Sequence, residues 1–563
     1  MSDITVYTAK RIITMNPSNP TATAVAVRDG HIVETGTLES IAPWLKHNAH
    51  VVDERFADSV LMPGLIDPHL HPSMAAVLLP MHFVTAMEWR LPWGTVKPVT
   101  TPEGFMQRVH ELHESLEDPD EPLLIWGYHN LWHGQVMRRE LNAVSKTRPI
   151  VSWQRSFHEL VLNDGAFDWL EIDEQRLSNA HQVDLPNGRF YEAGKGLVLA
   201  RLNPYLLAPE RFKAGLQRLR EVVHFGGHTT IADMAIPIFD MEMEWQQLLD
   251  VLDNEDTPFR VDMIANGWRL GDKAGSPEAA LEMIDALSKR NTSRLRFSDH
   301  VKFFADGAFF SQLAQMEVPG YIDGHHGEWM MSLENLEARA RVFWNAGYKI
   351  HIHATGDMGV GFVVDLLEKL QWERPRFNHG FTVEHFGFST PEQVQRLAAL
   401  GASVSANVYY LYELSESYAT DGIGYERADA MARIGSAVRA GMPTALHSDY
   451  TMAPALPLHS AWISANRINC EGRVVGEAER LTLDEALRAI TIDAARILGR
   501  EDEVGSIRAG KRADFAVLDR DPYDVGALGL RDINVLATVL DGCVYPIAES
   551  AFRQADCEQR TVE

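Results

Sequence analysis

Two histidines stand two residues apart at the end of a short apolar run. The run reads PGLIDPHLH from Pro63 to His71. Residues two apart on a strand face the same side, so His69 and His71 are placed to share one metal ion. Imidazole nitrogens are good ligands for zinc and similar divalent ions. An isolated pair among 23 histidines is weak evidence, so further ligands are needed to support a metal site.

A lysine interrupts a second apolar run, VKFFAD from Val301 to Asp306. One interpretation of Lys302 is a surface lysine whose charged head reaches solvent. The strands of a barrel are buried on both faces, however, and leave little room for that escape. The alternative is a lysine whose amine has reacted with carbon dioxide. A carbamylated lysine is anionic and is able to bridge two metal ions.

Three more apolar runs end in polar groups. They are KIHIHA, which contains His351 and His353, TVEH, which ends at His385, and LHSD, which contains His447 and ends at Asp449. Any one of these histidines would more often have a structural role. Polar groups at the ends of five separate runs are hard to obtain by chance. Barrel enzymes assemble their active sites at the C-terminal ends of their strands, and these groups fit that position.

The elements that would position these residues alternate between short apolar strands and helical patterns. This alternation indicates βα units and a parallel sheet. We expect eight strands, over residues 59–67, 229–234, 260–265, 301–306, 349–354, 381–386, 403–408 and 444–449. We expect helices over residues 208–225, 240–254, 276–290, 332–346, 357–370, 390–400 and 425–441. The predicted fold is therefore of the α/β class, a (β/α)8 barrel of the TIM type.

Two stretches around the barrel depart from this alternation. Residues from about 72 to 207 do not follow it and contain extra strand-like runs at 123–128 and 149–153. We interpret this stretch as a large insertion after the first barrel strand. After the eighth strand, residues 482–499 predict an amphipathic helix with a start rich in Thr and Asp.

The two ends of the chain have matching β-hairpin patterns. Residues 4–36 and 505–547 alternate apolar and polar residues around the turns Asp29-Gly30 and Asp541-Gly542. We predict a small discontinuous β-sandwich domain made of residues 1–60 plus 505–563. Residues 61–504, including the insertion, would form the barrel.

Composition excludes several classes of partner. The net charge of -26, with no long run of Lys or Arg, disfavours nucleic acid and anionic membranes. Three cysteines do not make a disulfide framework, and neither a signal peptide nor an 18-residue apolar run is apparent. We expect a cytoplasmic protein with a small-molecule substrate, no nucleic-acid or membrane partner, and the possibility of a homo-oligomer.

Taken together, the motifs resemble those of the amidohydrolase superfamily, and within it the YtcJ-like group of amidohydrolase family 3. The resemblance covers nearly the whole chain. It is found in the stretches MPGLIDPHLHP, VKFFADGAFF, HIHATGD, TVEHFG, LHSDYTMAP and GSIRAGKRADFAVLDRDP. N-substituted formamide deformylases and other hydrolases of amide or acyl groups belong to this group. The resemblance therefore implies a metal-dependent hydrolase.

The resemblance also implies which residues bind the metal. The matching ligands are His69, His71, Lys302, His353, His385 and Asp449. His351 shares a face with His353, so an error of register between the two remains open. The implied cofactor is one or two divalent ions, most simply Zn²⁺, with Lys302 carbamylated. Asp449 would take a proton from the attacking water and pass it to the leaving nitrogen.

The chain departs from the family pattern where substrate is expected. The fourth-strand motif continues as AFFSQL from Ala308 to Leu313, and the insertion contains GYHN around His129 and SFH ending at His158. We name His158, with His129 as the alternative, as a candidate catalytic donor to the carbonyl oxygen. Candidate substrate contacts are His129, Phe309 and Trp89. The aromatic content near the predicted mouth favours an apolar or aromatic substrate.

The predicted reaction is hydrolysis of a C–N bond in an amide or N-acyl group by a metal-activated water. The same type of site also deaminates rings or cleaves esters and lactones. A lyase or isomerase on this scaffold, or a metal-binding barrel without catalysis, is a further alternative.

Overall fold

Eight parallel strands form a barrel in the computed structural model, which describes residues 3–191 and 194–547. The strands are β5 (Leu65–Leu70), β14 (His228–Ile236), β15 (Arg260–Asn266), β16 (Leu295–Phe304), β17 (Lys349–Ala354), β18 (Thr382–His385), β19 (Ser403–Ala406) and β20 (Thr444–Leu446). Each pairs in parallel with the next in this order. Hydrogen bonds from Asp449 N to His69 O and from His71 N to Tyr450 O, both 2.9 Å, join the last strand to the first. The predicted (β/α)8 architecture is confirmed.

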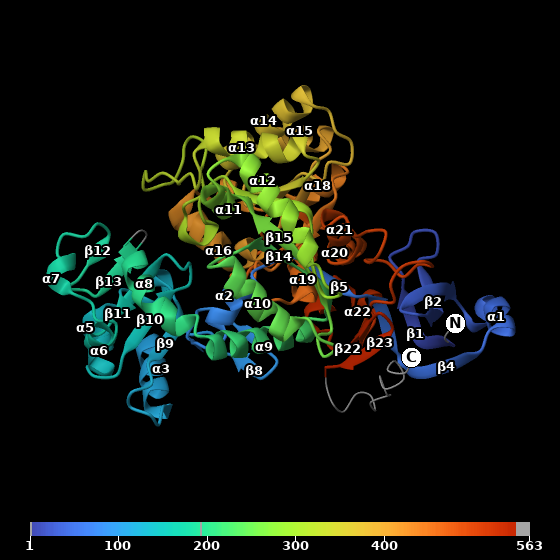
Figure 1. Ribbon diagram of the computed structural model, residues 1–563, viewed down its shortest axis with the longest axis horizontal. Coiled ribbons are helices and arrows are strands. Elements are labelled where there is room, and N and C mark those ends of the chain that lie inside the picture. The colour runs from blue at the N-terminus through green and yellow to red at the C-terminus, as the bar shows by residue number, and fades with distance from the viewer. Residues whose placement is uncertain (1–2, 192–193, 548–563) are drawn as a thin grey trace. The chain divides into compact units, whose positions relative to one another are not determined.

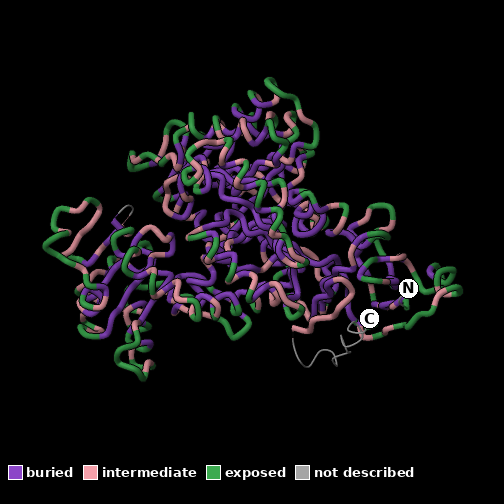
Figure 2. The backbone as a smooth tube through the Cα atoms, viewed as in Figure 1, coloured by how far each residue is buried: buried purple, intermediate pink, exposed green. Residues whose placement is uncertain are grey.

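Helices follow the barrel strands and pack around them (Figure 1), and the strands they enclose are buried (Figure 2). The helices are α10 (Met241–Leu252), α11 (Gly267–Ala274), α12 (Pro277–Asp285), α13 (Leu333–Asn345), α14 (Asp357–Glu373), α15 (Pro391–Ala399), α16 (Tyr409–Ser417) and α19 (Pro457–Asn466). Helix α9 (Pro209–Phe225) precedes β14 in the sequence, and most of it belongs to the unit of residues 72–222. Side-chain caps begin several of them. Ser276, Ser332 and Thr390 each accept a hydrogen bond from the backbone N–H three residues on, which satisfies a donor that the first helical turn leaves free.

Two predicted helices are each divided in the structure. The helix expected over 425–441 is α17 (Tyr425–Asp429) followed by α18 (Ile434–Arg439), and Ala432 between them has a positive φ of 49°. The helix expected over 482–499 is α20 (Leu483–Ala489) followed by α21 (Ile492–Ile497). Thr491 between them has non-helical dihedral angles, and its hydroxyl donates to Leu487 O at 2.7 Å. Both patterns were periodic, and a local turn interrupts each of them.

Strands from both ends of the chain form one seven-stranded sheet. Its order is β23 (Cys543–Pro546), β22 (Val535–Leu540), β21 (Phe515–Leu518), β4 (His50–Pro63), β1 (Ile4–Ile13), β2 (Thr21–Arg28) and β3 (His31–Gly36). The two ends meet where β21 pairs antiparallel with β4. Tyr7 and Val25 share one apolar core with Phe515 and Val539. Helix α1 (Leu38–His47) packs its Ile41 against the other side of β1 and β2.

The predicted division into domains stays a prediction. Residues 548–563, which complete the predicted segment 505–563 and include Cys557, lie outside the described residues. Helix α22 (Pro522–Gly529) lies between β21 and β22 in the sequence.

The strand expected over residues 59–67 belongs to two sheets. Residues 59–63 end β4 of the seven-stranded sheet, and Leu65 begins barrel strand β5. Gly64 separates them, and its N–H donates to Asp514 O at 3.0 Å. A Cβ at Gly64 would lie 2.0 Å from the Thr229 hydroxyl, so only glycine fits this close crossing.

Residues 72–222 form a second compact unit, which is described by itself. Its six-stranded sheet has the order β12 (Val183–Asp184), β13 (Arg189–Tyr191), β11 (Glu159–Leu162), β10 (Ile150–Gln154), β9 (Leu123–Tyr128) and β6 (His82–Phe83). A two-stranded sheet pairs β7 (Trp89–Leu91) with β8 (Gly94–Val96). Its helices are α2 (Pro72–Leu78), α3 (Pro102–Ser115), α4 (Asn130–His133), α5 (Arg138–Val144), α6 (Asp164–Trp169), α7 (Glu174–Leu177) and α8 (Lys195–Leu206).

Within the described residues, no helix combines the length and the apolar character that a membrane crossing requires.

Candidate metal centre

Two strand ends bring three histidines to a single carboxylate, which follows a third strand, at the C-terminal mouth of the barrel. The nearer oxygen of Asp449, Oδ1, lies 3.1 Å from His71 Nε2 and 3.5 Å from His69 Nε2. The other, Oδ2, lies 3.7 Å from His385 Nδ1. Four residues predicted as ligands are therefore close together, although 380 residues separate His69 from Asp449 in the sequence.

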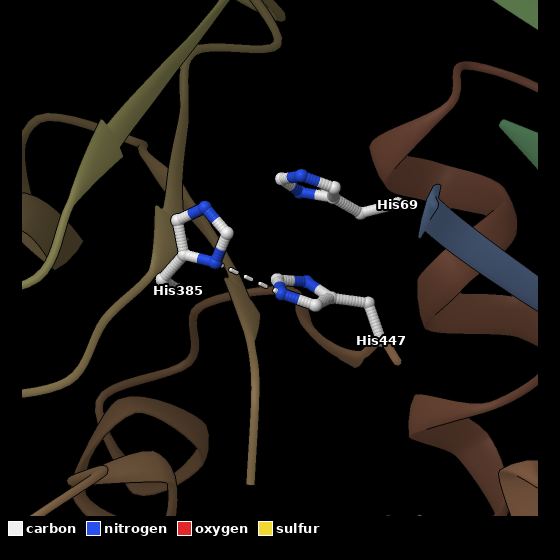
Figure 3. Close-up of side chains that lie close together, drawn as sticks. All are labelled: His69, His385 and His447. Carbon is white, nitrogen blue, oxygen red and sulfur yellow. Dashed lines mark hydrogen bonds between the residues drawn. The ribbon is translucent and has the colours of Figure 1, made fainter. Parts of the chain in front are cut away.

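His447 joins this group, and the sequence analysis did not select it as a ligand. The nearest nitrogens of His69, His385 and His447 lie within 4.8 Å of one another. Figure 3 shows the three rings facing one another, with His447 Nε2 3.3 Å from His385 Nδ1. The other nitrogen of His447, Nδ1, forms a 2.7 Å hydrogen bond with the Ser405 hydroxyl. The signal was present in LHSD, where His447 stands two residues before Asp449.

Left-handed backbone turns two of these side chains toward the site. His385 has φ of 73° and Asp449 has φ of 52°, conformations that residues other than glycine rarely adopt. Asp67 holds the neighbouring backbone in place, because its carboxylate accepts from His69 N, at 3.1 Å, and from the Ser448 hydroxyl, at 2.5 Å. Such strained backbone clusters at functional sites.

A chain of hydrogen bonds runs inward from His69 through the barrel interior. His69 Nδ1 and His351 Nδ1 donate to the two oxygens of Glu384, each at 2.7 Å. His351 Nε2 in turn lies 2.8 Å from His300 Nδ1. We call Glu384, His351 and His300 the inner chain. It fixes Nδ1 of His69 as the donor and leaves Nε2 free to bind a cation, as in many histidine metal ligands.

His353 and Lys302 lie beside the convergent histidines. The ring of His353 is 4.3 Å from that of His385, and its Nε2 is 3.5 Å from Gly307 O. Both ring nitrogens of His351 are engaged in the inner chain, so His353 is the better placed of the two to reach a metal.

Lys302 is fully buried, and within the described chain its Nζ has no hydrogen-bond partner. Burial lowers the pKa of Lys302 to about 8, against the opposing effect of the carboxylates of Glu384 and Asp449. A buried amine without a partner calls for an explanation, because unsatisfied polar groups of this kind are rare in folded proteins.

The electrostatics of the site keep its histidines neutral. Burial lowers the pKa of His69 and His385 well below their usual range, that of His353 to about 3 and that of His447 to about 4. The positive charge of Lys302 lowers all four pKa values further. Neutral imidazoles present lone pairs, so neutral histidines converging on a carboxylate fit a divalent cation.

The remaining predicted residues lie in two places. Phe309 belongs to the barrel unit and stacks on Tyr410, with ring centroids 4.2 Å apart. His129, His158 and Trp89 belong to the insertion unit, so their predicted roles at the site stay predictions. Within that unit His129 accepts from Leu131 N at 3.2 Å, and Trp89 packs on Trp126 with centroids 5.3 Å apart.

Comparison with known proteins adds to this geometry. The N-substituted formamide deformylase of Arthrobacter pascens is 25% identical, over 96% of this chain and 98% of its own length. The amidohydrolase YtcJ of Bacillus subtilis (strain 168) is 22% identical, over 94% of this chain and 97% of its own. A crystal structure of an uncharacterized metal-dependent hydrolase from Pyrococcus horikoshii has a TM-score of 0.71 at 20% identity, covers 93% of this chain and 99% of that chain, and shows the same fold.

The sequence model of the amidohydrolase family matches residues 57–545, so the predicted resemblance is confirmed and the chain belongs to the amidohydrolase family.

Proposed function

We propose that this protein hydrolyses an amide or N-acyl C–N bond in a small apolar or aromatic substrate. As a member of the amidohydrolase family it is a metal-dependent hydrolase acting on C–N bonds. The observation that carries the proposal is the convergence of His69, His71 and His385 on Asp449 at the barrel mouth. Barrel enzymes place their reacting groups at this end.

The proposed ligands are the six residues predicted from the sequence, with His447 as a further candidate. They are His69, His71, Lys302, His353, His385 and Asp449. When bound, one or two Zn²⁺ or similar ions would polarise the scissile carbonyl and lower the pKa of water. The protein's own contribution is to hold neutral imidazoles and a carboxylate in fixed positions in a buried site.

We propose that Lys302 is carbamylated. Its neutral amine nitrogen attacks carbon dioxide, an N–C bond forms, and one proton is released to give the anionic carbamate. The pKa of about 8 favours this reaction, because the neutral amine is the nucleophile. The carbamate supplies two oxygens where the buried Nζ otherwise has no partner in the described part of the chain.

Asp449 is the proposed proton carrier. It takes the proton from the attacking water and later passes it to the leaving nitrogen, so that the amine departs as a neutral molecule. His158 is the proposed hydrogen-bond donor to the carbonyl oxygen, with His129, Trp89 and Phe309 as substrate contacts.

A cavity beside the barrel mouth has a mixed lining of aromatic, apolar and charged side chains. The cavity, of about 440 Å³, lies between the segments that follow β14 and β15. Its lining includes the apolar Phe239, Met241 and Trp268 and the charged Asp240, Arg269, Asp272 and Lys273. Trp268 packs on Phe304 at 5.8 Å between centroids, and Phe304 packs on His353 at 5.9 Å. Aromatic side chains thus connect the cavity to the candidate ligands. The relative named as a deformylase of N-substituted formamides supports N-aryl and N-alkyl formamides as the first compounds to test.

Metal dependence is the first test. Purified protein is expected to contain a divalent ion by elemental analysis, and chelation should abolish release of 4-nitroaniline from 4-nitroformanilide. Added Zn²⁺ should restore it. Full activity in protein shown to be metal-free would contradict the proposal.

Carbamylation is tested separately at Lys302. Lys302→Ala should lose metal and activity, and a short carboxylic acid such as propionate should restore part of both. Lys302→Arg should not be rescued, because guanidinium stays cationic. Crystals grown with bicarbonate should show the carbamate, and an unmodified amine directed away from the metals would refute the bridging role.

A further inference from the structure

Tyr410 is a buried phenol beside the candidate ligands that the sequence analysis did not select. It lies at the second position of α16, which follows barrel strand β19, and only 2% of its surface is exposed. Its ring is 6.2 Å from the ring of His385. Within the described residues its hydroxyl forms no hydrogen bond, which leaves one donor uncommitted at the site.

The surrounding aromatic side chains hold the Tyr410 ring in one position. Phe309 stacks on it at 4.2 Å with an interplanar angle of 8°, and Phe310 meets its ring at 5.4 Å in an edge contact. Phe309 is itself stacked on Phe388, at 5.1 Å, and on Tyr418, whose hydroxyl donates to Phe309 O at 2.8 Å. A ring packed in this way does not reorient when charge develops nearby.

The backbone before Tyr410 is tied to the strand end that contains Asp449. Asn407 accepts from Tyr409 N at 3.0 Å, and its amide donates to Ser448 O at 3.3 Å. One side chain therefore links the start of α16 to the residue next to Asp449. The phenol and the carboxylate are held on the same part of the barrel mouth.

The charges around Tyr410 keep its hydroxyl protonated. Burial raises the pKa of Tyr410 well above its usual range, and the negative charges of Asp449 and Asp306 raise it further. At neutral pH the group is therefore a hydrogen-bond donor.

We propose that the Tyr410 hydroxyl donates a hydrogen bond to the substrate carbonyl oxygen as that oxygen becomes an anion. This inference rests on the proposed hydrolysis of a C–N bond. Water adds to the carbonyl carbon and the C=O π electrons move to oxygen, where the Tyr410 O–H stabilises the negative charge without giving up its proton. The oxyanion electrons then re-form the C=O bond, and the C–N bond breaks with its electron pair going to nitrogen. The nitrogen takes the proton that Asp449 removed from the water, which gives the neutral amine and the carboxylic product.

The test removes the hydroxyl oxygen of Tyr410 and keeps its ring. Tyr410→Phe should lower kcat for 4-nitroformanilide by about 10² to 10³-fold, the usual effect of losing one donor to an oxyanion, with KM changed little. Metal content should stay at the wild-type level. Tyr409→Phe is the matched control, because the Tyr409 hydroxyl lies one residue away and is bonded to His459 Nδ1 at 3.0 Å. Its kcat should match that of the wild type.

A binding measurement gives a readout that does not depend on turnover. Phenylphosphinate has anionic oxygens on a tetrahedral centre. Calorimetry should show it binding the metal-loaded Tyr410→Phe protein about 10-fold or more weakly than the wild type, because a hydrogen bond to a charged group is lost. A crystal structure of the wild-type complex should place the Tyr410 hydroxyl within hydrogen-bond distance of a phosphinate oxygen.

The two measurements separate the two ideas. If the wild type hydrolyses the anilide, and Tyr410→Phe equals it in kcat and in phosphinate affinity, the Tyr410 assignment is overturned and the proposed function stands. If the wild type cleaves no C–N substrate but Tyr410→Phe weakens phosphinate binding, the proposed function fails and Tyr410 remains an anion donor. If the wild type cleaves no C–N substrate and phosphinate binds the two proteins equally or not at all, the proposed function and the Tyr410 assignment are both refuted.

Discussion

The barrel interior contains two groups of polar residues with opposite hydrogen bonding. In the inner chain, both nitrogens of His351 and both oxygens of Glu384 have partners within the protein. At the mouth, by contrast, His71 Nδ1 has no partner in the described chain, and lone pairs face one another around Asp449. Glu384 and His351 are closed in this way, although Nε2 of His300 at the end of the inner chain has no partner in the described residues, whereas the mouth is open at the atoms that face Asp449. The difference fits the proposal that the inner chain positions side chains and that the mouth holds the cation.

The largest effect is expected at the mouth, from Asp449→Asn. The amide has the same shape but neither the charge nor the basicity of the carboxylate, so turnover should fall by at least about 10³-fold. Bound metal, measured by elemental analysis, should fall as well. Asp365→Asn on α14 is the matched control, because that carboxylate pairs with Arg396 on the surface. Near wild-type turnover in Asp449→Asn would show that the residues at the barrel mouth take no part in the mechanism.

Glu384→Gln should have the next largest effect. Glutamine has a single acceptor oxygen, so it cannot accept from both His69 and His351 as the carboxylate does. Metal affinity should fall about 10 to 100-fold, the range found when a partner of a metal ligand is removed. Competition with a chelator of known affinity measures it. A loss as complete as that of Asp449→Asn would mean that Glu384 itself binds the metal.

A smaller effect is expected one step further along the inner chain. His351→Leu removes the second donor to Glu384, whereas the amide of His351→Asn retains a donor near the position of Nδ1. Metal affinity should fall by less than about 10-fold in the leucine variant, since an intramolecular hydrogen bond contributes about 1 kcal/mol. The asparagine variant should recover most of the loss. Equal affinities in the two variants would show that the hydrogen bond has no part in positioning.

The smallest effect on metal binding is expected at Arg260, which lies outside both the inner chain and the barrel mouth. This buried guanidinium on β15 pairs with Asp514 and Asp541 of the seven-stranded sheet, each at 2.5 Å. Arg260→Leu should lower the free energy of unfolding by about 3 to 5 kcal/mol, because it leaves buried charge unpaired. Metal affinity per folded molecule should not change. The control is Arg296→Leu, which breaks a half-exposed pair with Glu503 and should cost about 1 kcal/mol or less.

The same ion pair predicts how stability depends on pH. Burial alone would raise the pKa of Asp541, but Arg260 and Arg512 outweigh burial and lower it. The folded pKa therefore lies below the unfolded value of about 3.9. The contribution of Asp541 is fully present above that value and is lost as pH falls through the lowered folded pKa. The free energies of unfolding of the wild type and of Arg260→Leu, measured by chemical unfolding, should therefore differ less as the pH falls through this acidic range.

The sequence predicted the barrel well because each strand is a short apolar run that ends in a polar group. It predicted His69, His71, His385 and Asp449 from those ends, and they lie together. It did not select Glu384, because alternation along a strand lets only one of two adjacent side chains face inward. It also did not select His447, although that residue stands two before Asp449 and so shares its face. The positive φ of His385 turns its side chain back into the interior beside Glu384, and no sequence pattern indicates such a turn.

Two other features were also hidden from sequence reasoning. The run over 59–67 read as one strand, and only the close approach of Thr229 to Gly64 reveals two. Tyr410 lies in a helical pattern where an aromatic residue predicts packing, and its uncommitted hydroxyl appears only once the neighbouring partners are known.

The bonds that close the barrel have a consequence for how the protein is made. Asp449 N donates to His69 O, and His71 N donates to Tyr450 O, so the seam between first and last strands runs through three of the proposed metal ligands. A ribosome adding about 5 to 20 residues each second needs some 20 to 80 s between His69 and Asp449. During that interval a nascent chain has the HxH pair without its carboxylate. A chain released before residue 449 would therefore have neither a closed barrel nor the full set of proposed ligands.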